Sequence, residues 1–297
     1  MNNNKMNIVL SSDDKFAPFL GTTLASILIN ADASDELNFI ILDGGISEKN
    51  KQGINGLKKF KEFDIEFINL KNLPTTAENK RKAHPAFFRL KIASIKPELD
   101  KVLYLDSDLI VKTSLKPLWD EDIENYIIAA VENPGEPAKA MQKQFKTENY
   151  FNSGVLLINL KKWRENNIEN ELISYIDSQS SIIKTGDLPY GDQNILNVVL
   201  DKQVKYLHLK WNAIHTTCLE QVAYTRLEEM EEASCNPAII HFTSSNKPWT
   251  GLRHKHKATF YYYLFKTPWA LQILLFNITF WVKQLIIRKI KLIKNKI

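Results

Sequence analysis

The chain has 297 residues, 44% of them apolar, with only ten Gly and eleven Pro. These values are typical of a globular protein with a large buried core, and they exclude a disordered or fibrous chain. The net charge of +5 is unevenly distributed, because residues 233–297 contain eleven of the 39 Lys and Arg and no Asp or Glu. We therefore expect the C-terminal part of the chain to interact with anions.

The cysteines and the N-terminus indicate a cellular compartment. Cys218 and Cys235 are too few for a disulfide framework, and no zinc-type spacing joins them to the six histidines. The first residues, MNNNKMNIVLSSDD, lack the cationic segment and apolar stretch of a signal peptide. We expect reduced thiols and a cytoplasmic location.

The first part of the chain alternates short apolar runs with amphipathic segments. This pattern is typical of βαβ units around a mostly parallel sheet. The strands that it predicts span residues 6–10, 37–42, 65–70 and 102–105. The helices predicted between them span residues 16–28, 47–60 and 85–92, with Ser47 as a cap and Pro85 in a first turn.

The second part of the chain continues the alternation. Further strands are predicted at residues 127–131 and 155–159, and further helices at residues 161–177 and 192–200. The composition changes near Thr250, where basic and aromatic residues become frequent. We therefore expect one domain over residues 1–250, followed by a basic amphipathic segment over residues 251–297.

Two carboxylates, Asp106 and Asp108, directly follow the strand predicted at residues 102–105. Ligands of open α/β sheets bind beyond the carboxyl ends of strands, and alternate residues of extended chain point the same way. Two such oxygen donors suit Mg²⁺ or Mn²⁺. There are two alternatives. The pair could be a turn with solvated carboxylates, or the protein could be a phosphohydrolase that attacks phosphorus with Asp106 as its nucleophile. Three preceding βα units, and no convincing later acidic pair, disfavour the phosphohydrolase.

Five motifs follow one another along the chain. They read LSSDDKF, DKVLYLDSDLIV, YFNSGVLLINL, YGDQNILN and AIIHFTSSNKPW, and together they span about residues 6–250. In this order they resemble the retaining glycosyltransferases of family 8, near the lipooligosaccharide galactosyltransferases. The resemblance implies an α/β protein with the GT-A nucleotide-diphospho-sugar transferase fold, a Rossmann-like mixed sheet flanked by helices.

The resemblance also implies a metal site. Asp106, Asp108 and His241 would bind Mn²⁺, with Mg²⁺ as a possible substitute, and the ion would bridge the two phosphates of a UDP-sugar. A divalent cation stabilises the negative charge that develops on departing UDP without any proton transfer. Lys247 would hold the diphosphate as a point charge.

By the same resemblance, the donor is held by residues from each motif. The implied donor-binding residues are Ser11, Ser12, Asp13, Asp14, Lys15, Arg89, Asp106, Ser107, Asn152, Ser153, Asp192, Gln193 and Lys247. The first five would hold uracil and ribose, and the four from Asn152 to Gln193 would surround the hexose. Glu132 lies where relatives have an acidic group near the sugar.

Structural alternatives exist for several of these residues. Asp13, Asp14 and Asp192 could cap helices, the NSG of residues 152–154 could form a turn, and Arg89 could be a solvated surface charge.

Catalysis is expected at Asp192 and Gln193. Retention can proceed through a covalent intermediate or through front-face attack, in which the departing phosphate helps to deprotonate the acceptor. An amide is a poorer nucleophile than a carboxylate. We therefore favour the front-face route, with Gln193 stabilising positive charge on the sugar.

The end of the chain has helical spacing of its apolar residues and many cations. The apolar stretch over residues 268–282 has fifteen residues, fewer than the roughly 20 that span a bilayer. This pattern favours a helix that lies on an anionic membrane surface, with a helix packed on the domain or on another subunit as the alternative. Aromatic residues are clustered rather than interleaved with the cations, which argues against nucleic acid.

Together these features predict a metal-dependent hexosyltransferase. It would move galactose or glucose, with retention, from a UDP-sugar to the core glycan of a lipopolysaccharide or lipooligosaccharide, a glycolipid or oligosaccharide acceptor. The enzyme would lie at the inner face of the cell membrane as a peripheral protein. A nucleotide-sugar-binding protein without turnover remains a further alternative.

Overall fold

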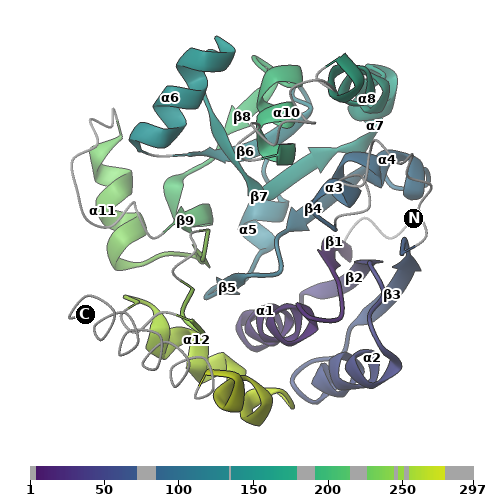
Figure 1. Cartoon of the computed structure of the whole chain (residues 1–297), viewed down its shortest axis with the longest axis vertical. Coiled ribbons are helices and arrows are strands. Elements are labelled where there is room, and N and C mark those ends of the chain that lie inside the picture. The colour runs from purple at the N-terminus through teal and green to yellow at the C-terminus, as the bar shows by residue number, and fades with distance from the viewer. Residues whose placement is uncertain are drawn as a thin grey trace, which may run out of the picture.

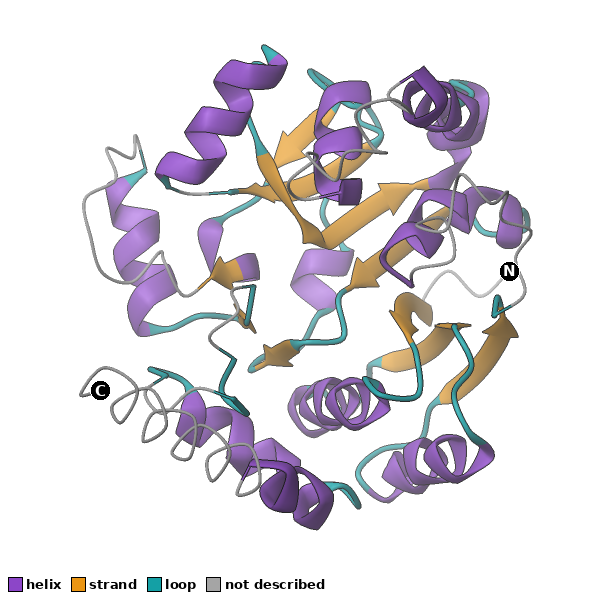
Figure 2. Ribbon diagram, viewed as in Figure 1, coloured by secondary structure: helices purple, strands orange, loops and turns teal. Residues whose placement is uncertain are grey.

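A mixed seven-stranded sheet with helices on both faces forms the centre of the molecule (Figures 1 and 2). The computed structural model describes residues 5–71, 85–133, 135–178, 191–214, 226–243, 247–250 and 254–277. The sheet has the order β3-β2-β1-β4-β7-β6-β8. Its strands are β1 Lys5–Ser12, β2 Glu36–Asp43, β3 Asp64–Asn69, β4 Lys101–Leu105, β6 Ile128–Glu132, β7 Phe151–Asn159 and β8 Val204–Tyr206.

The strand directions determine which side chains meet at one edge of this sheet. The pairs β1–β2, β2–β3, β1–β4 and β6–β8 are parallel, whereas β7 is antiparallel to both β4 and β6. The carboxyl ends of β1 and β4 therefore lie beside the start of β7. A second sheet has the order β5-β10-β9, from Leu109–Val111, Ile239–His241 and Ala213–Ile214.

Helices cover both faces of the large sheet. The helices of the described residues are α1 Ala17–Asn30, α2 Glu48–Asn55, α3 Pro85–Phe88, α4 Ile92–Ile95, α5 Lys116–Trp119, α6 Glu136–Phe145, α7 Leu160–Glu165, α8 Ile168–Ser178, α10 Gly191–Val199, α11 Leu227–Cys235 and α12 Lys257–Leu264. Short 3-10 helices are η1 Gly56–Lys59, η3 Arg89–Lys91 and η4 Leu209–Asn212. The helices α1 and α2 cover one face, and α3, α4, α7, α8 and α10 cover the other.

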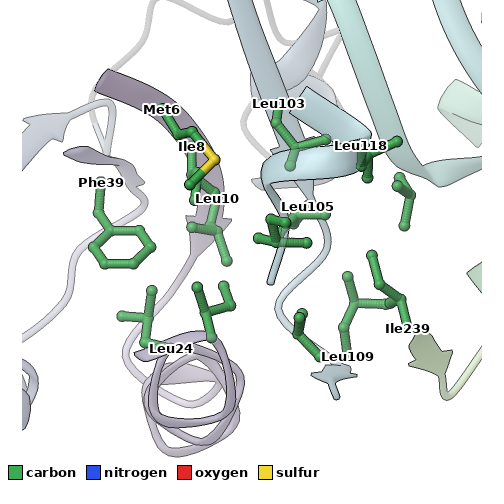
Figure 3. Packing of buried hydrophobic residues seen from close by; sticks show 14 of the residues in the cluster. Met6, Ile8, Leu10, Leu24, Phe39, Leu103, Leu105, Leu109, Leu118 and Ile239 are labelled. Carbon is green, nitrogen blue, oxygen red and sulfur yellow. The ribbon is translucent and has the colours of Figure 1, made fainter. Parts of the chain in front are cut away.

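The core explains why the strands read as continuous apolar runs. Along β1, Met6, Ile8 and Leu10 pack under α1, as Figure 3 shows, whereas Val9 joins the cluster on the opposite face. A strand covered on both faces has no side exposed to water, so polar alternation is lost. Each fully buried side chain of this size contributes about 1.5–3 kcal/mol of transfer free energy.

The predicted elements are confirmed with three differences. The single helix expected over residues 161–177 is two helices, because Asn167 has a left-handed backbone with φ of 56° and separates α7 from α8. Asparagine tolerates this conformation better than most residues. The NSG stretch lies inside β7 rather than in a turn, and β7 begins at Phe151 instead of residue 155. The elements α5, α6, α11, β5, β8, β9 and β10 were not predicted.

The beginning of the predicted C-terminal segment packs against the domain. Phe260 and Leu264 of α12 share a buried cluster with Phe19 of α1 and Phe242 after β10, and Figure 1 shows α12 beside α1. Residues 270–277 are helical, and residues 278–297 lie outside the described residues. The division of the chain at residue 250 stays a prediction. Among the described helices none is both long and apolar enough to cross a bilayer.

Candidate metal and nucleotide-sugar site

A pocket lies where the carboxyl ends of β1 and β4 meet, as the sequence predicts for ligands of an open α/β sheet. It lies between the loop after β1, the turn after β4 and the start of α3. The residues that line it are Ser11, Ser12, Asp13, Phe16, Pro85, Ala86, Arg89, Asp106, Ser107 and Asp108. The structure therefore brings residues of the first two motifs together with Arg89.

Three of the expected ligands converge beside this pocket. Asp106, Asp108 and His241 each offer one ligand atom, and these atoms lie within 4.8 Å of one another. Nε2 of His241 lies 3.3 Å from Oδ1 of Asp108 and 3.6 Å from Oδ2 of Asp106. His241 reaches the pair because β10 runs antiparallel to β5, which places it opposite Leu109. The small sheet thus brings together residues far apart in sequence.

The space around the cluster fits a divalent cation. A Cβ atom at Gly154 would lie 2.1 Å from Cε1 of His241 and 2.8 Å from Oδ2 of Asp106. Any other residue in this position would displace the ligands, so glycine keeps the site open. Two carboxylates and one imidazole form a mixed oxygen and nitrogen set that suits a divalent metal. Divalent-metal dependence is therefore consistent with the residues present.

A buried asparagine orients the imidazole of His241. Nδ1 of His241 lies 2.9 Å from Oδ1 of Asn212, whose amide group donates to Oδ1 of Asn152 at 2.8 Å. Since the amide nitrogen faces Asn152, the oxygen accepts from Nδ1–H of His241, and Nε2 faces the carboxylates. Asn212 was not predicted as a site residue, because it lies in the stretch HLKWNAI, which has none of the five motifs.

Two cations balance the two carboxylates. Nη2 of Arg89 lies 2.8 Å from Oδ1 of Asp106, and Nζ of Lys247 lies 2.6 Å from Oδ2 of Asp108. Burial alone would raise the pKa of Asp108, but His241 and Lys247 lower it well below its ordinary value. The carboxylates of Asp106 and Asp108 are therefore ion-paired. The alternative of a turn with solvated carboxylates is wrong.

Arg89 is a buried residue of the site rather than a surface charge. Its side chain is 4% exposed, and Nε lies 3.1 Å from Oδ2 of Asp192. Nη1 donates to the carbonyl oxygen of Ser153 at 2.5 Å. Burial alone would lower the pKa of Arg89, but the charges of Asp106 and Asp192 raise it above its ordinary value. Arg89 thus links the turn after β4 to the start of α10.

The residues expected around the hexose form one buried polar network. Oε1 of Gln193 accepts hydrogen bonds from the backbone of Ser153 at 3.1 Å and from Nδ2 of Asn152 at 3.2 Å. Nε2 of Gln193 donates to the hydroxyl of Tyr150 at 3.3 Å.

Glu132 is the last residue of β6, and burial raises the pKa of its carboxyl group.

The two aspartates of the loop after β1 face different ways. Asp13 lines the pocket and its Oδ1 accepts from the backbone of Phe16 at 2.9 Å. Oδ1 of Asp14 instead accepts from the backbone of Ser47, the residue before α2, at 2.8 Å. Both carboxylates therefore accept a backbone hydrogen bond at the start of a helix, Asp13 before α1 and Asp14 before α2, and Lys15 is exposed beside them.

We predict that Asn212→Leu lowers affinity for a divalent metal about 10- to 100-fold, because a lost partner lets the imidazole turn. Titration calorimetry with Mn²⁺ measures this change. Asn212→Asp keeps an acceptor for Nδ1–H of His241 and is the matched control, which we expect to bind more tightly than the leucine variant. Equal affinity of the wild type and a folded leucine variant would contradict the orienting role.

Comparison with known proteins supports the interpretation of the site. The family model described as Glycosyl transferase family 8 matches residues 7–252. General stress protein A of Bacillus subtilis (strain 168) is 31% identical over 273 residues, which are 89% of this chain and 94% of that protein. Lipopolysaccharide 1,2-glucosyltransferase of Escherichia coli (strain K12) is 27% identical, over 82% of this chain and 73% of its own length.

Solved structures agree with these relatives. The galactosyltransferase LgtC in complex with donor and acceptor sugar analogues superposes with a TM-score of 0.71 and 28% identity, over 89% of this chain and 96% of that one. The common architecture is the GT-A fold, which confirms the predicted fold class, and its enzymes typically depend on a divalent metal. The phosphohydrolase alternative finds no support among these relatives. This chain belongs to glycosyltransferase family 8.

Proposed function

We propose that this protein transfers galactose or glucose from a UDP-sugar, with retention, to the core glycan of a lipopolysaccharide or lipooligosaccharide. The main support is the convergence of Asp106, Asp108 and His241 beside a pocket that also contains Arg89. A relative named as a lipopolysaccharide 1,2-glucosyltransferase and a structural neighbour named as a galactosyltransferase support the choice of hexose and acceptor.

In this proposal the donor lies along the pocket. Uracil and ribose contact the loop of residues 11–15, and the diphosphate lies beside the acidic cluster, where Lys247 and Arg89 are available as counter-charges. Asp106, Asp108 and His241 hold Mn²⁺, with Mg²⁺ as the possible substitute. The bound ion supplies positive charge to the diphosphate as it departs. Lys247, which pairs with Asp108 in the free protein, would hold a phosphate oxygen instead.

The hexose lies beside Asn152, Ser153, Asp192 and Gln193. The bond from the anomeric carbon to the UDP oxygen breaks, and the acceptor oxygen bonds to the same face of that carbon. The acceptor proton passes to the departing phosphate. Asp192 forms an ion pair with buried Arg89, and Oε1 of Gln193 already accepts two hydrogen bonds. Either group would have to leave these partners to attack the sugar, which favours the front-face route.

We expect Asp106→Asn and Asp108→Asn each to weaken binding of both Mn²⁺ and UDP. The loss of affinity should exceed the roughly 10- to 100-fold that is typical when a residue that hydrogen-bonds to a metal ligand is replaced. Calorimetry with Mn²⁺ alone, and then with UDP in its presence, measures both. Asp100→Asn removes an exposed carboxylate that pairs with Arg164 on the surface and is the matched control. Unchanged UDP affinity in both site variants, with phosphate release from small phosphoesters by the wild type, would contradict the proposal.

A panel of UDP-sugars tests the donor without knowledge of the acceptor. With Mn²⁺ present, we expect slow release of UDP from UDP-galactose or UDP-glucose, because water can replace the acceptor. Release is measured by chromatography, with UDP-N-acetylhexosamines as the comparison. A wild type that binds these donors but never releases UDP, even with lipopolysaccharide core acceptors, would indicate binding without turnover.

We further propose that the enzyme works at the cytoplasmic face of the membrane, held there by its C-terminal segment. Exposed apolar side chains on the described part of this segment support the proposal: Tyr262, Phe265, Leu271, Leu275 and Phe276. Basic residues that could contact anionic lipid continue through residues 278–297.

Deletion of residues 278–297 tests the membrane proposal and leaves the buried residues before this range in place. We expect the shortened protein to lose co-sedimentation with vesicles that contain anionic lipid, because six of the ten Lys and Arg of residues 251–297 are removed. Vesicles of neutral lipid are the control. Equal sedimentation of both forms with anionic vesicles would contradict the proposed role of these residues.

A further inference from the structure

Trp269 occupies a slot between two helices of the catalytic domain. Its side chain is part of the main core cluster and is 4% exposed. A Cβ atom at Gly21 of α1 would lie 2.1 Å from Cζ3 of the indole, and one at Gly53 of α2 would lie 2.7 Å from Cζ2. A larger residue at either position would collide with the ring, so the two glycines form a slot for it.

The indole nitrogen begins a chain of hydrogen bonds. Nε1–H of Trp269 donates to Oδ1 of Asn50 at 2.8 Å. Since the oxygen of this amide is used by the indole, its nitrogen faces the other way and donates to Oδ1 of Asp14 at 2.8 Å. The same nitrogen lies 3.4 Å from the carbonyl oxygen of Asp14. Trp269 therefore determines the orientation of the amide that holds Asp14.

Asp14 lies within the loop that lines the donor pocket. Its neighbours Ser12, Asp13 and Phe16 all contribute to the pocket wall. The backbone of Ser47 donates to the same oxygen of Asp14, and these hydrogen bonds lower the pKa of its carboxyl group. Because peptide units are rigid and the loop is short, movement at Asp14 also moves the residues on either side.

We infer that Trp269 is a positioning residue for the nucleotide: through Asn50 and Asp14, the segment after α12 holds the loop after β1 in the shape that receives the donor. The inference relies on the proposed function, which places the uridine part of the donor on this loop. It gives Asp14 a role that is different from contact with the donor, and it gives the C-terminal segment a role inside the enzyme.

If Trp269 had a purely structural role, its replacement would have a different effect. In that case its replacement would lower the thermal stability but leave the loop and the nucleotide affinity unchanged. The chain provides a matched control, because Tyr263 of the same segment accepts a hydrogen bond from Nδ2 of Asn30 at 2.7 Å, at the other end of α1. Both contacts join the C-terminal segment to the domain, but only that of Trp269 leads to Asp14.

The test compares Trp269→Phe with Tyr263→Phe. Each variant keeps an aromatic ring and removes one polar group. We expect Trp269→Phe to weaken UDP binding in the presence of Mn²⁺ by about three- to ten-fold, the effect of losing one buried hydrogen bond, and Tyr263→Phe to leave it unchanged. In an Asn50→Ala background the effect of Trp269→Phe should disappear, because the relay is already broken.

Amide hydrogen exchange of residues 12–16 in the free protein provides a readout that needs no nucleotide. We expect faster exchange in Trp269→Phe and the wild-type rate in Tyr263→Phe. Unchanged exchange in Trp269→Phe would overturn the inference, as would equal UDP affinities in all the variants. A wild type that binds no UDP would contradict the proposed function, whereas the exchange experiment would still decide whether Trp269 holds the loop.

Discussion

The site depends on pairing two carboxylates with cations at a largely buried turn. An unpaired charge in such a place costs several kcal/mol, so a fold that places Asp106 and Asp108 beyond β4 must also bring cations to them. Arg89 pairs with the first and Lys247 with the second. The cations come from η3 and from the chain after β10, so the acidic turn requires that these distant segments pack together.

The sheet topology provides this convergence. Since β1 and β4 are parallel neighbours, their carboxyl ends share one edge, and antiparallel β7 brings its first residues to that same edge. The register of β7 against β6 is irregular after Ala130, opposite the NSG stretch. Gly154 lies within this irregular stretch and passes close to the acidic cluster. The mixed directions of the strands therefore determine which residues meet at the site.

Buried amides connect the acidic cluster to the residues proposed to contact the hexose. From His241 the contacts run through Asn212 and Asn152 to Gln193. Each amide has its oxygen and nitrogen assigned by its neighbours, so the network has one consistent arrangement and resists rotation of any member. Such a network holds the proposed metal ligands and the proposed sugar-contacting groups at a constant separation, which a group-transfer reaction requires.

The sequence by itself determined most strands of the large sheet, most of the helices that cover it, the acidic turn and the family, because apolar periodicity and short motifs depend on residues that are neighbours in the chain. The tertiary structure alone decided that Arg89 is buried, that Asn212 orients His241, and that Trp269 fits between Gly21 and Gly53. Such contacts join side chains from distant parts of the chain. No local pattern encodes their separation, because it is set only when the sheet and its helices pack.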